Sequence, residues 1–287
     1  MHPHLYAFAA ILCWASLPAA TGNCLDGLSV TELLFFSFVP AALYLAGQEI
    51  VLRRSLRIPI PSFNLSLLGV IGIFGYHWVY YLALDHAPVV EGAILATTWS
   101  FWIVIISSVL RCGMLRLTTL GLAVLGMYGA YLVIAGGRGL SFDAAYLEGY
   151  IYALGCGFIW SGFSVTLSRC HPAEDYMPAF TIFAALISSG MFIVHVYGTT
   201  DYALPPVSVL LSALYLGLVP LGLSFTLWNK AVVHGNMTIV GYLSYLTPPL
   251  AVLLVAVVRQ APVPVHAVAG LVCILAAAML GRLQLRE

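Results

Sequence analysis

Long apolar stretches alternate with short polar breaks along the whole chain. Each stretch holds about 20 residues, the length of a helix that crosses the hydrocarbon core of a bilayer. The breaks contain residues that favour turns, for example Gly22-Asn23, Pro88 and Gly235-Asn236. The pattern predicts ten membrane-spanning helices, at residues 4–22, 31–51, 63–84, 89–110, 114–135, 146–167, 175–197, 206–229, 236–257 and 264–283.

Composition supports an all-α integral membrane protein. Hydrophobic residues make up 62% of the 287 positions and charged residues only 8%, with a mean hydropathy of +1.00. A soluble domain carries roughly 25% charged residues, so this chain has too few polar groups to cover a water-facing surface. The breaks between spans are too short for a nucleotide-binding module, which excludes an ATP-driven pump within one chain. No basic patch extends beyond Arg53, Arg54 and Arg57, so nucleic acid is not an expected partner.

The positive charges predict the orientation of the spans, because cytoplasmic loops carry an excess of Lys and Arg. A cytoplasmic N-terminus places nine of these residues inside and only Arg138 and Arg259 outside. The nine inner residues are Arg53, Arg54, Arg57, Arg111, Arg116, Arg169, Lys230, Arg282 and Arg286. With ten spans, both termini are therefore expected in the cytoplasm.

The first five spans match the last five in their markers. Trp14 lies 146 positions before Trp160, and His86 lies 148 positions before His234 when ALDHAPVVEGAIL is aligned with AVVHGNMTIVGYL. We therefore predict two five-helix repeats, at residues 1–137 and 146–287. An odd number of spans in each repeat inserts the two in opposite senses. Transporters built in this way bind substrate near mid-membrane, where the repeats meet.

With these markers the chain resembles the drug/metabolite transporter superfamily, in particular its ten-helix EamA-type members. The segment YHWVYYLAL followed by ATTWSFW is most similar to the bacterial aromatic amino-acid exporters. The resemblance implies a secondary transporter of the bacterial inner membrane that moves a small molecule. It implies no cofactor, and it leaves self-association open.

Spans three and four carry polar and aromatic side chains at mid-membrane depth, where such groups usually face protein or a water-filled cavity. Helical spacing places Tyr76 and Tyr80 on one stripe of span three, flanked by His77 and Tyr81. Trp99 lies near the centre of span four, away from the interfacial belt that explains Trp at span ends. We predict that these five residues line a substrate cavity. A packed aromatic interface is the alternative.

The second half offers a different set of candidates. They are Ser224, Trp228 and Asn229 in span eight, and Tyr242, Ser244 and Tyr245 in span nine. Pro248-Pro249 removes two backbone donors inside span nine, which frees carbonyl groups for a ligand or a neighbour. Trp14 and Trp160 occupy equivalent depths in the two halves. They either form opposing walls of the cavity or act as packing wedges.

The placement of titratable groups bears on energy coupling. Acidic residues lie near span ends, and the deepest, Glu49 and Glu91, can reach the interface. His77 is the best candidate proton carrier, because the ordinary pKa of histidine is about 6.5. Without a central carboxylate, facilitated diffusion or uniport is the more economical mechanism. Proton antiport in a broad drug or metabolite efflux protein remains the alternative.

The expected function is therefore export of aromatic or other apolar amino acids, or similar amphipathic metabolites, by alternating access. A rival from another class is an intramembrane enzyme that modifies lipids, and a non-transporting structural or sensor protein is a third possibility. The sequence contains no HExxH, GxSxG or Walker A motif, and its six cysteines form no CxxC pair. No catalytic residue, metal or cofactor is therefore expected. Small residues in spans five and ten predict that these two helices pack closely.

Overall fold

The computed structural model describes residues 2–137, 139, 142–199, 202–259 and 262–284. Within this part of the chain, ten helical segments are long and apolar enough to cross a membrane. They are Pro3–Leu25, Val30–Arg53, Phe63–His86, Val90–Cys112, Leu117–Ala135, Ala144–Cys170, Met177–Gly198, Val207–His234, Met237–Leu254 and Val265–Leu283. These segments match the ten predicted spans, and the all-helical membrane fold is confirmed.

Several spans consist of more than one helix. The first five are built from α1 (Pro3–Trp14), α2 (Leu17–Leu25), α3 (Val30–Arg53), α4 (Phe63–Gly69), η1 (Val70–Gly75), α5 (Tyr76–His86), α6 (Val89–Ala96), α7 (Thr98–Cys112) and α8 (Leu117–Ala135). The last five are built from η2 (Ala144–Tyr146), α9 (Leu147–Cys170), α10 (Met177–Gly198), α11 (Val207–Leu216), η3 (Gly217–Leu223), α12 (Ser224–His234), α13 (Met237–Ser244), α14 (Thr247–Arg259) and α15 (Val265–Gln284).

The helix breaks inside the spans fall at equivalent positions of the two halves only where the sequences of the halves are alike. Span four breaks between α6 and α7 at Thr97, and span nine breaks 148 positions later, between α13 and α14, at Tyr245. Span one breaks before Pro18, whose missing N–H interrupts the helical ladder. The equivalent residue of span six is Ser164, and α9 runs through it without a break. Proline therefore explains why span one is broken and its counterpart, span six, is continuous.

Both halves also contain a π-helical segment, which the sequence pattern did not predict. η1 begins at Val70 and η3 begins at Gly217, 147 positions later, in the middle of spans three and eight. A π-helical turn inserts an extra residue and rotates the side chains that follow it, and such turns are frequent at functional sites. Here they are followed directly by α5 and α12, which carry most of the candidate residues of these spans.

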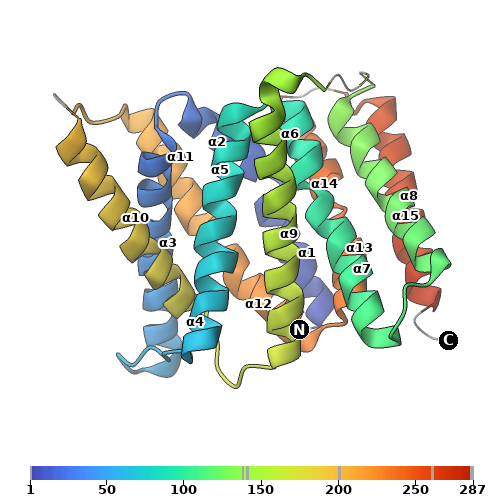
Figure 1. Ribbon diagram of the computed structural model, residues 1–287, viewed down its shortest axis with the longest axis horizontal. Helices are drawn as coiled ribbons and strands as arrows, with labels where there is room; N and C mark the ends of the chain where they lie inside the picture. The colour runs from blue at the N-terminus through green and yellow to red at the C-terminus, as the bar shows by residue number, and fades with distance from the viewer. Residues whose placement is uncertain (1, 138, 140–141, 200–201, 260–261, 285–287) are drawn as a thin grey trace.

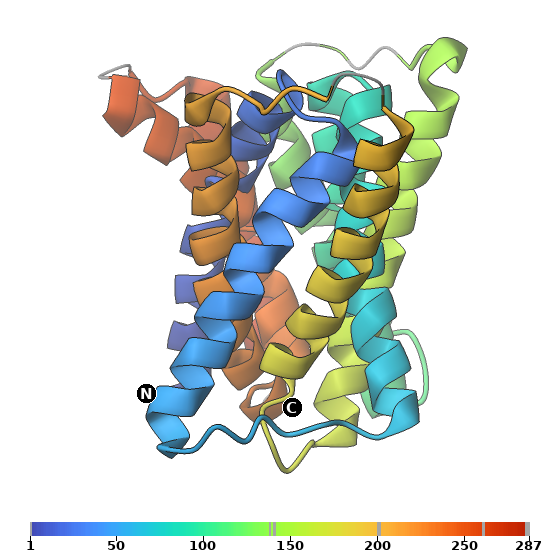
Figure 2. The same ribbon diagram turned by 90° about the vertical axis from the view of Figure 1, so that its left-hand side faces the viewer.

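The spans stand side by side in one bundle with the α3–α10 pair at one edge and the α8–α15 pair at the other (Figure 1). A quarter turn shows α3 and α10 adjacent in front (Figure 2). At the other edge a Cβ added to Gly129 would lie 2.7 Å from the Gly270 carbonyl oxygen, so glycine permits the predicted close packing of spans five and ten.

The two ends of the bundle differ in charge. We call the end with the 54–62, 113–116 and 171–176 loops and both termini the basic face (Figure 1). The other end, with the 26–29, 87–88 and 202–206 loops, is the opposite face. Eight of the nine Lys and Arg residues predicted for one side, all except Arg286, lie among the described residues and belong to the basic face. Arg286 and Arg138 lie outside the described residues.

Candidate substrate cavity

A cavity of about 480 Å³ lies between the two halves and continues to the opposite face. Its volume is within the range of small-molecule sites, about 300–1,000 Å³. Its inner end is lined by Trp14, Tyr76, His77, Tyr80, Trp99, Trp160 and Phe225. Its outer walls are lined mainly by apolar residues of α2, α6, α8 and α14, together with Pro262 and Pro264.

Tryptophans from four spans meet at the inner end of this cavity. The ring of Trp14 lies 5.3 Å from Trp160 and 5.9 Å from Trp99, in edge-to-face geometry. Trp228 closes the cluster from behind, 4.9 Å from Trp14 and 5.7 Å from Trp99. Edge-to-face pairs of this kind add about 0.5–1.5 kcal/mol each beyond burial of their area. The equivalent residues Trp14 and Trp160 thus pack against each other and also form cavity wall.

The π-helical segments hold this cluster in place. The Trp14 Nε1–H donates to the carbonyl oxygen of Pro220 in η3 at 2.9 Å, across the boundary between the halves. The Ser224 hydroxyl donates to the same oxygen. In the other half, His77 Nδ1 lies 2.8 Å from the carbonyl oxygen of Ile73 in η1. Because a carbonyl only accepts, Nδ1 carries the proton, which leaves Nε2 of the neutral ring available to a ligand.

The cavity offers polar atoms but almost no charge. The hydroxyls of Tyr76 and Tyr80 and the indole N–H groups of Trp99 and Trp160 belong to lining residues, and none of them forms a hydrogen bond to a described residue. No Asp, Glu, Lys or Arg lines the cavity within the described ranges. The site therefore presents aromatic faces together with a few neutral donors and acceptors.

Six of the thirteen candidate residues line the cavity: Trp14, Tyr76, His77, Tyr80, Trp99 and Trp160. The other seven do not, and most of them bond elsewhere in the protein. Trp228 donates to the Ser164 hydroxyl at 3.1 Å, and Tyr245 donates to the Ala123 carbonyl at 2.9 Å. Tyr81 lies behind the wall with its hydroxyl 3.4 Å from that of Ser37.

The remaining four candidates lie away from the wall for similar reasons. Ser224 is bonded within its own helix, and Ser244 donates to the Ser100 hydroxyl at 2.8 Å. Tyr242 is buried beside α15, where its ring meets Gly281. Asn229 points toward Asp175 at the basic face. Helical periodicity predicted which residues of spans eight and nine share a face. It did not predict which of those faces turns toward the cavity.

Several lining residues were missing from the candidates. Phe225 packs 5.5 Å from His77, and Thr97, Thr247 and Pro248 lie at the two helix breaks. The sequence did contain a signal for part of this set. Pro248 and Pro249 lack backbone N–H groups, so they mark span nine as a place where the helix is interrupted.

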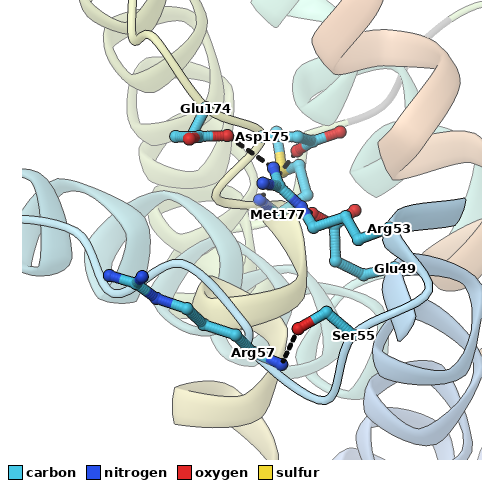
Figure 3. A network of polar contacts seen from close by, with 7 residues as sticks. All are labelled: Glu49, Arg53, Ser55, Arg57, Glu174, Asp175 and Met177. Atoms are coloured by element: carbon cyan, nitrogen blue, oxygen red, sulfur yellow. Dashed lines mark hydrogen bonds and ion pairs between the residues drawn. The ribbon is translucent and has the colours of Figure 1, made fainter.

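At the basic face an ionic network joins the two halves (Figure 3). Arg53 at the end of α3 pairs with Glu49 on its own helix and with Glu174 in the 171–176 loop. Asp175 beside it accepts from the Met177 N–H at 3.0 Å. Burial raises the pKa of the Asp175 carboxyl, and the bonds from Met177 and Asn229 oppose part of that rise. The acidic groups of this loop are thus turned toward α3 and α12.

The sequence profile of the EamA-like transporter family matches the chain twice, at residues 2–135 and 147–282. The two matches together cover nearly all of the chain. The chain belongs to the EamA-like transporter family. Membership gives it two repeats and points to a multi-pass membrane transporter.

Similar proteins support this assignment. The chain is 31% identical over 258 residues to the aromatic amino acid exporter YddG of Ancylobacter novellus, covering 88% of this chain and 87% of that protein. The exporter of the same name from Escherichia coli is 27% identical over 151 residues, 48% of each chain. A solved crystal structure superimposes with a TM-score of 0.85 at 26% identity, covering 98% of this chain and 96% of that one. The resemblance to EamA-type transporters is confirmed.

Proposed function

We propose that this EamA-like transporter exports aromatic and other apolar amino acids across the bacterial inner membrane. The observation that carries the proposal is the uncharged, aromatic-lined cavity of about 480 Å³ at the junction of the halves. The names of the similar exporters support the same substrate class. We take residues 1–137 and 146–287 as the two functional repeats.

The cavity chemistry suits a zwitterion with an apolar side chain. Ring faces of Trp14, Trp99 and Trp160 would pack against the side chain, since aromatic walls combine apolar contact with specific geometry. The hydroxyls of Tyr76 and Tyr80 would orient the carboxylate and the amine. A buried carboxylate or guanidinium would favour a substrate of opposite net charge, and none lines the cavity within the described residues.

We infer that the basic face is cytoplasmic, following the excess of positive charge in cytoplasmic loops. Both termini then lie inside. The cavity opens away from the basic face, so this conformation corresponds to the outward-open state of an exporter. Release to the outside would occur directly from the tryptophan cluster past α6 and α14.

Facilitated diffusion is the simplest coupling scheme, because no carboxylate lines the cavity among the residues that the structure describes. Proton antiport is the second candidate, and one observation favours it. His77 lines the cavity with Nδ1 bonded to Ile73 and Nε2 free, so it can accept a proton where substrate also binds. Uniport predicts that downhill efflux persists after the proton gradient is dissipated, whereas antiport predicts a large fall.

Flux through purified protein in proteoliposomes tests the proposal. Vesicles loaded with unlabelled phenylalanine should take up labelled phenylalanine by exchange, and a competition series across the twenty amino acids should rank Phe, Trp and Tyr first. Net downhill efflux, measured with and without a protonophore, separates uniport from antiport. Absence of exchange for every amino acid, with exchange of lipophilic drugs instead, would replace the amino-acid assignment by broad efflux.

A further inference from the structure

A second recess, of about 370 Å³, lies on the basic face where the ends of α7 and α9 meet the start of α13. Val165 and Thr238 are among its lining residues. The repeat offsets relate Val165 to Ala19 and Thr238 to Val90, and both of those line the central cavity. The recess is therefore the counterpart, on the other face, of the mouth of the open cavity.

A seam between α7 and α13 separates this recess from the tryptophan cluster. A Cβ added to Gly241 of α13 would lie 2.8 Å from side-chain atoms of Ile103 and Val104, so the helices touch at this glycine. Hydroxyl pairs join them on either side. Ser107 lies 3.1 Å from Thr238, and Ser244 donates to Ser100.

In the other half, the equivalent residues of α6 and α14 line the two sides of the open cavity and form no such seam. Thr238, Gly241 and Ser244 correspond to Val90, Ala93 and Ala96, which all line the open cavity. The opposing residues Ile103 and Val104 correspond to Ala251 and Val252, which line it too. Opening the α7–α13 seam would therefore connect the recess to the tryptophan cluster.

The recess carries positive charge that the protein does not neutralise. Arg111 and Arg169 line it together with His171, and neither arginine forms an ion pair within the described ranges. The acidic residues that follow His171 in the chain are occupied elsewhere. Glu174 bonds Arg53 of α3, and Asp175 bonds Met177 at the start of α10 (Figure 3).

We propose that this recess is the entrance through which substrate reaches the transporter from the basic face, and that Arg111 and Arg169, assisted by His171, attract and hold its carboxylate. The inference rests on the proposed amino-acid export. Guanidinium groups form charge-assisted hydrogen bonds with carboxylates, and a positive mouth raises the rate at which anionic groups arrive. No Lys or Arg lines the central cavity within the described residues, so the carboxylate is attracted at the mouth and is not trapped at the site.

Two simpler roles for these arginines make different predictions. Arginines that only fix the orientation of the protein in the membrane would not affect the affinity of a correctly inserted protein. A basic pocket can also bind a lipid phosphate, in which case the effect of removing it depends on anionic lipid.

The test is transport into inside-out membrane vesicles, whose outer solution contacts the basic face. In the R111Q/R169Q double variant we expect the apparent KM for phenylalanine to rise about threefold to tenfold at low salt, with the maximal rate unchanged. R111K/R169K should retain the wild-type KM, and R57Q, a loop arginine outside the recess, should leave it unchanged. High salt should bring the wild-type KM toward that of the double variant. Right-side-out vesicles should show no difference in KM.

An unchanged KM at the basic face in R111Q/R169Q, in vesicles where the wild type transports, overturns the entrance. Failure of the wild type itself to transport any amino acid instead refutes the proposed function. The same variants in oriented phosphatidylcholine proteoliposomes should keep the difference in KM. A difference that appears only when phosphatidylglycerol is added would assign the recess to a lipid phosphate and would also overturn the proposal.

Discussion

Spans four and nine carry equivalent rows of residues, which we call stripes. The stripe of span four faces the open cavity, whereas the stripe of span nine is packed against a neighbouring helix. On the open side, Val90, Ala93 and Ala96 of α6 face the cavity. On the closed side their counterparts in α13 are Thr238, Gly241 and Ser244, and they contact α7. The open stripe is apolar, whereas the closed stripe combines a glycine with hydroxyls.

This difference in chemistry has a physical consequence. Hydroxyls that pair across a closed seam can exchange that bond for water when the seam opens, so the net free-energy change is small, about 0.5–1.5 kcal/mol per bond. An apolar stripe behaves in the opposite way, because closing it removes apolar area from water at about 25 cal/mol per Å². We therefore expect the open stripe to close most readily over an apolar substrate.

The largest effect should follow from Gly241→Leu. The new side chain has no room against Ile103 and Val104, and overpacking of this kind costs about 1–3 kcal/mol. The closed seam should fail to form, and phenylalanine exchange should fall by about tenfold or more. In a protein that carries a cysteine in place of Ala93, a membrane-impermeant maleimide reports how open the cavity is. The rate of this labelling should fall together with exchange.

Gly121→Leu is the matched control for that variant, since nothing lies within 4 Å of a Cβ added to Gly121. It should keep wild-type exchange and labelling. Wild-type exchange by Gly241→Leu at equal membrane abundance would show that the seam does not govern access.

A second large effect is expected in the tryptophan cluster at the inner end of the cavity. Trp14→Ala removes ring contacts with Trp99, Trp160 and Trp228 and the bond to Pro220. Loss of a buried aromatic side chain costs about 3–5 kcal/mol, so both thermal stability in detergent and exchange should drop, the latter by about tenfold or more. Trp14→Phe should keep part of the stacking and lose less.

Trp78→Ala provides the comparison, because Trp78 lies on α5 with 40% of its surface exposed. Its melting temperature and exchange rate should stay close to those of the wild type. Equal losses in the Trp14 and Trp78 variants would mean that the cluster has no special part in binding.

A smaller shift should follow from removing the seam hydroxyls. In Ser107→Ala and Ser244→Ala, one interhelical hydrogen bond is lost, and such bonds in membrane proteins average about 0.6 kcal/mol. Each variant should shift the balance about threefold toward the state open at the basic face, seen as slower labelling at the Ala93 cysteine. Ser212→Ala, which loses only a bond within α11, should not change labelling.

The smallest effect is expected when hydroxyls are placed on the open stripe. Val90→Thr and Ala96→Ser add groups that water in the cavity can satisfy, so labelling at Ala93 should change by less than about twofold. A change as large as that of the seam variants would indicate that the two stripes are energetically alike, despite their different residues.

The sequence was enough to predict the scaffold. Apolar stretches of membrane length located all ten spans, and the 146–148 offset between the halves identified the repeat. For the cavity, central aromatics such as Tyr76 and Trp99 were identified because polar-tipped rings at mid-membrane depth need a protein environment. The binding role of these residues stays a prediction.

The faces turned toward the cavity could not be predicted in the second half. Periodicity at 100° per residue holds for a straight helix, whereas η1, η3 and the breaks at Thr97 and Tyr245 rotate the residues that follow them. In span eight, Phe225 and Asn229 follow η3, and Phe225 rather than Asn229 faces the cavity. In span nine, Tyr242 and Tyr245 come before or at the break and face Gly281 of α15 and Ala123 of α8, whereas Pro248 after the break lines the cavity.

The sequence by itself determined what the chain must be, a ten-span membrane protein of two repeats, because apolar stretches and recurring marker residues are read directly from the order of residues. Only the tertiary structure decided which of two equivalent stripes is open. Nearly symmetric halves allow either one to close, and in this structure the closed one is the stripe of Gly241, which packs against Ile103 and Val104. That selection depends on contacts between residues more than a hundred positions apart, which no local pattern encodes.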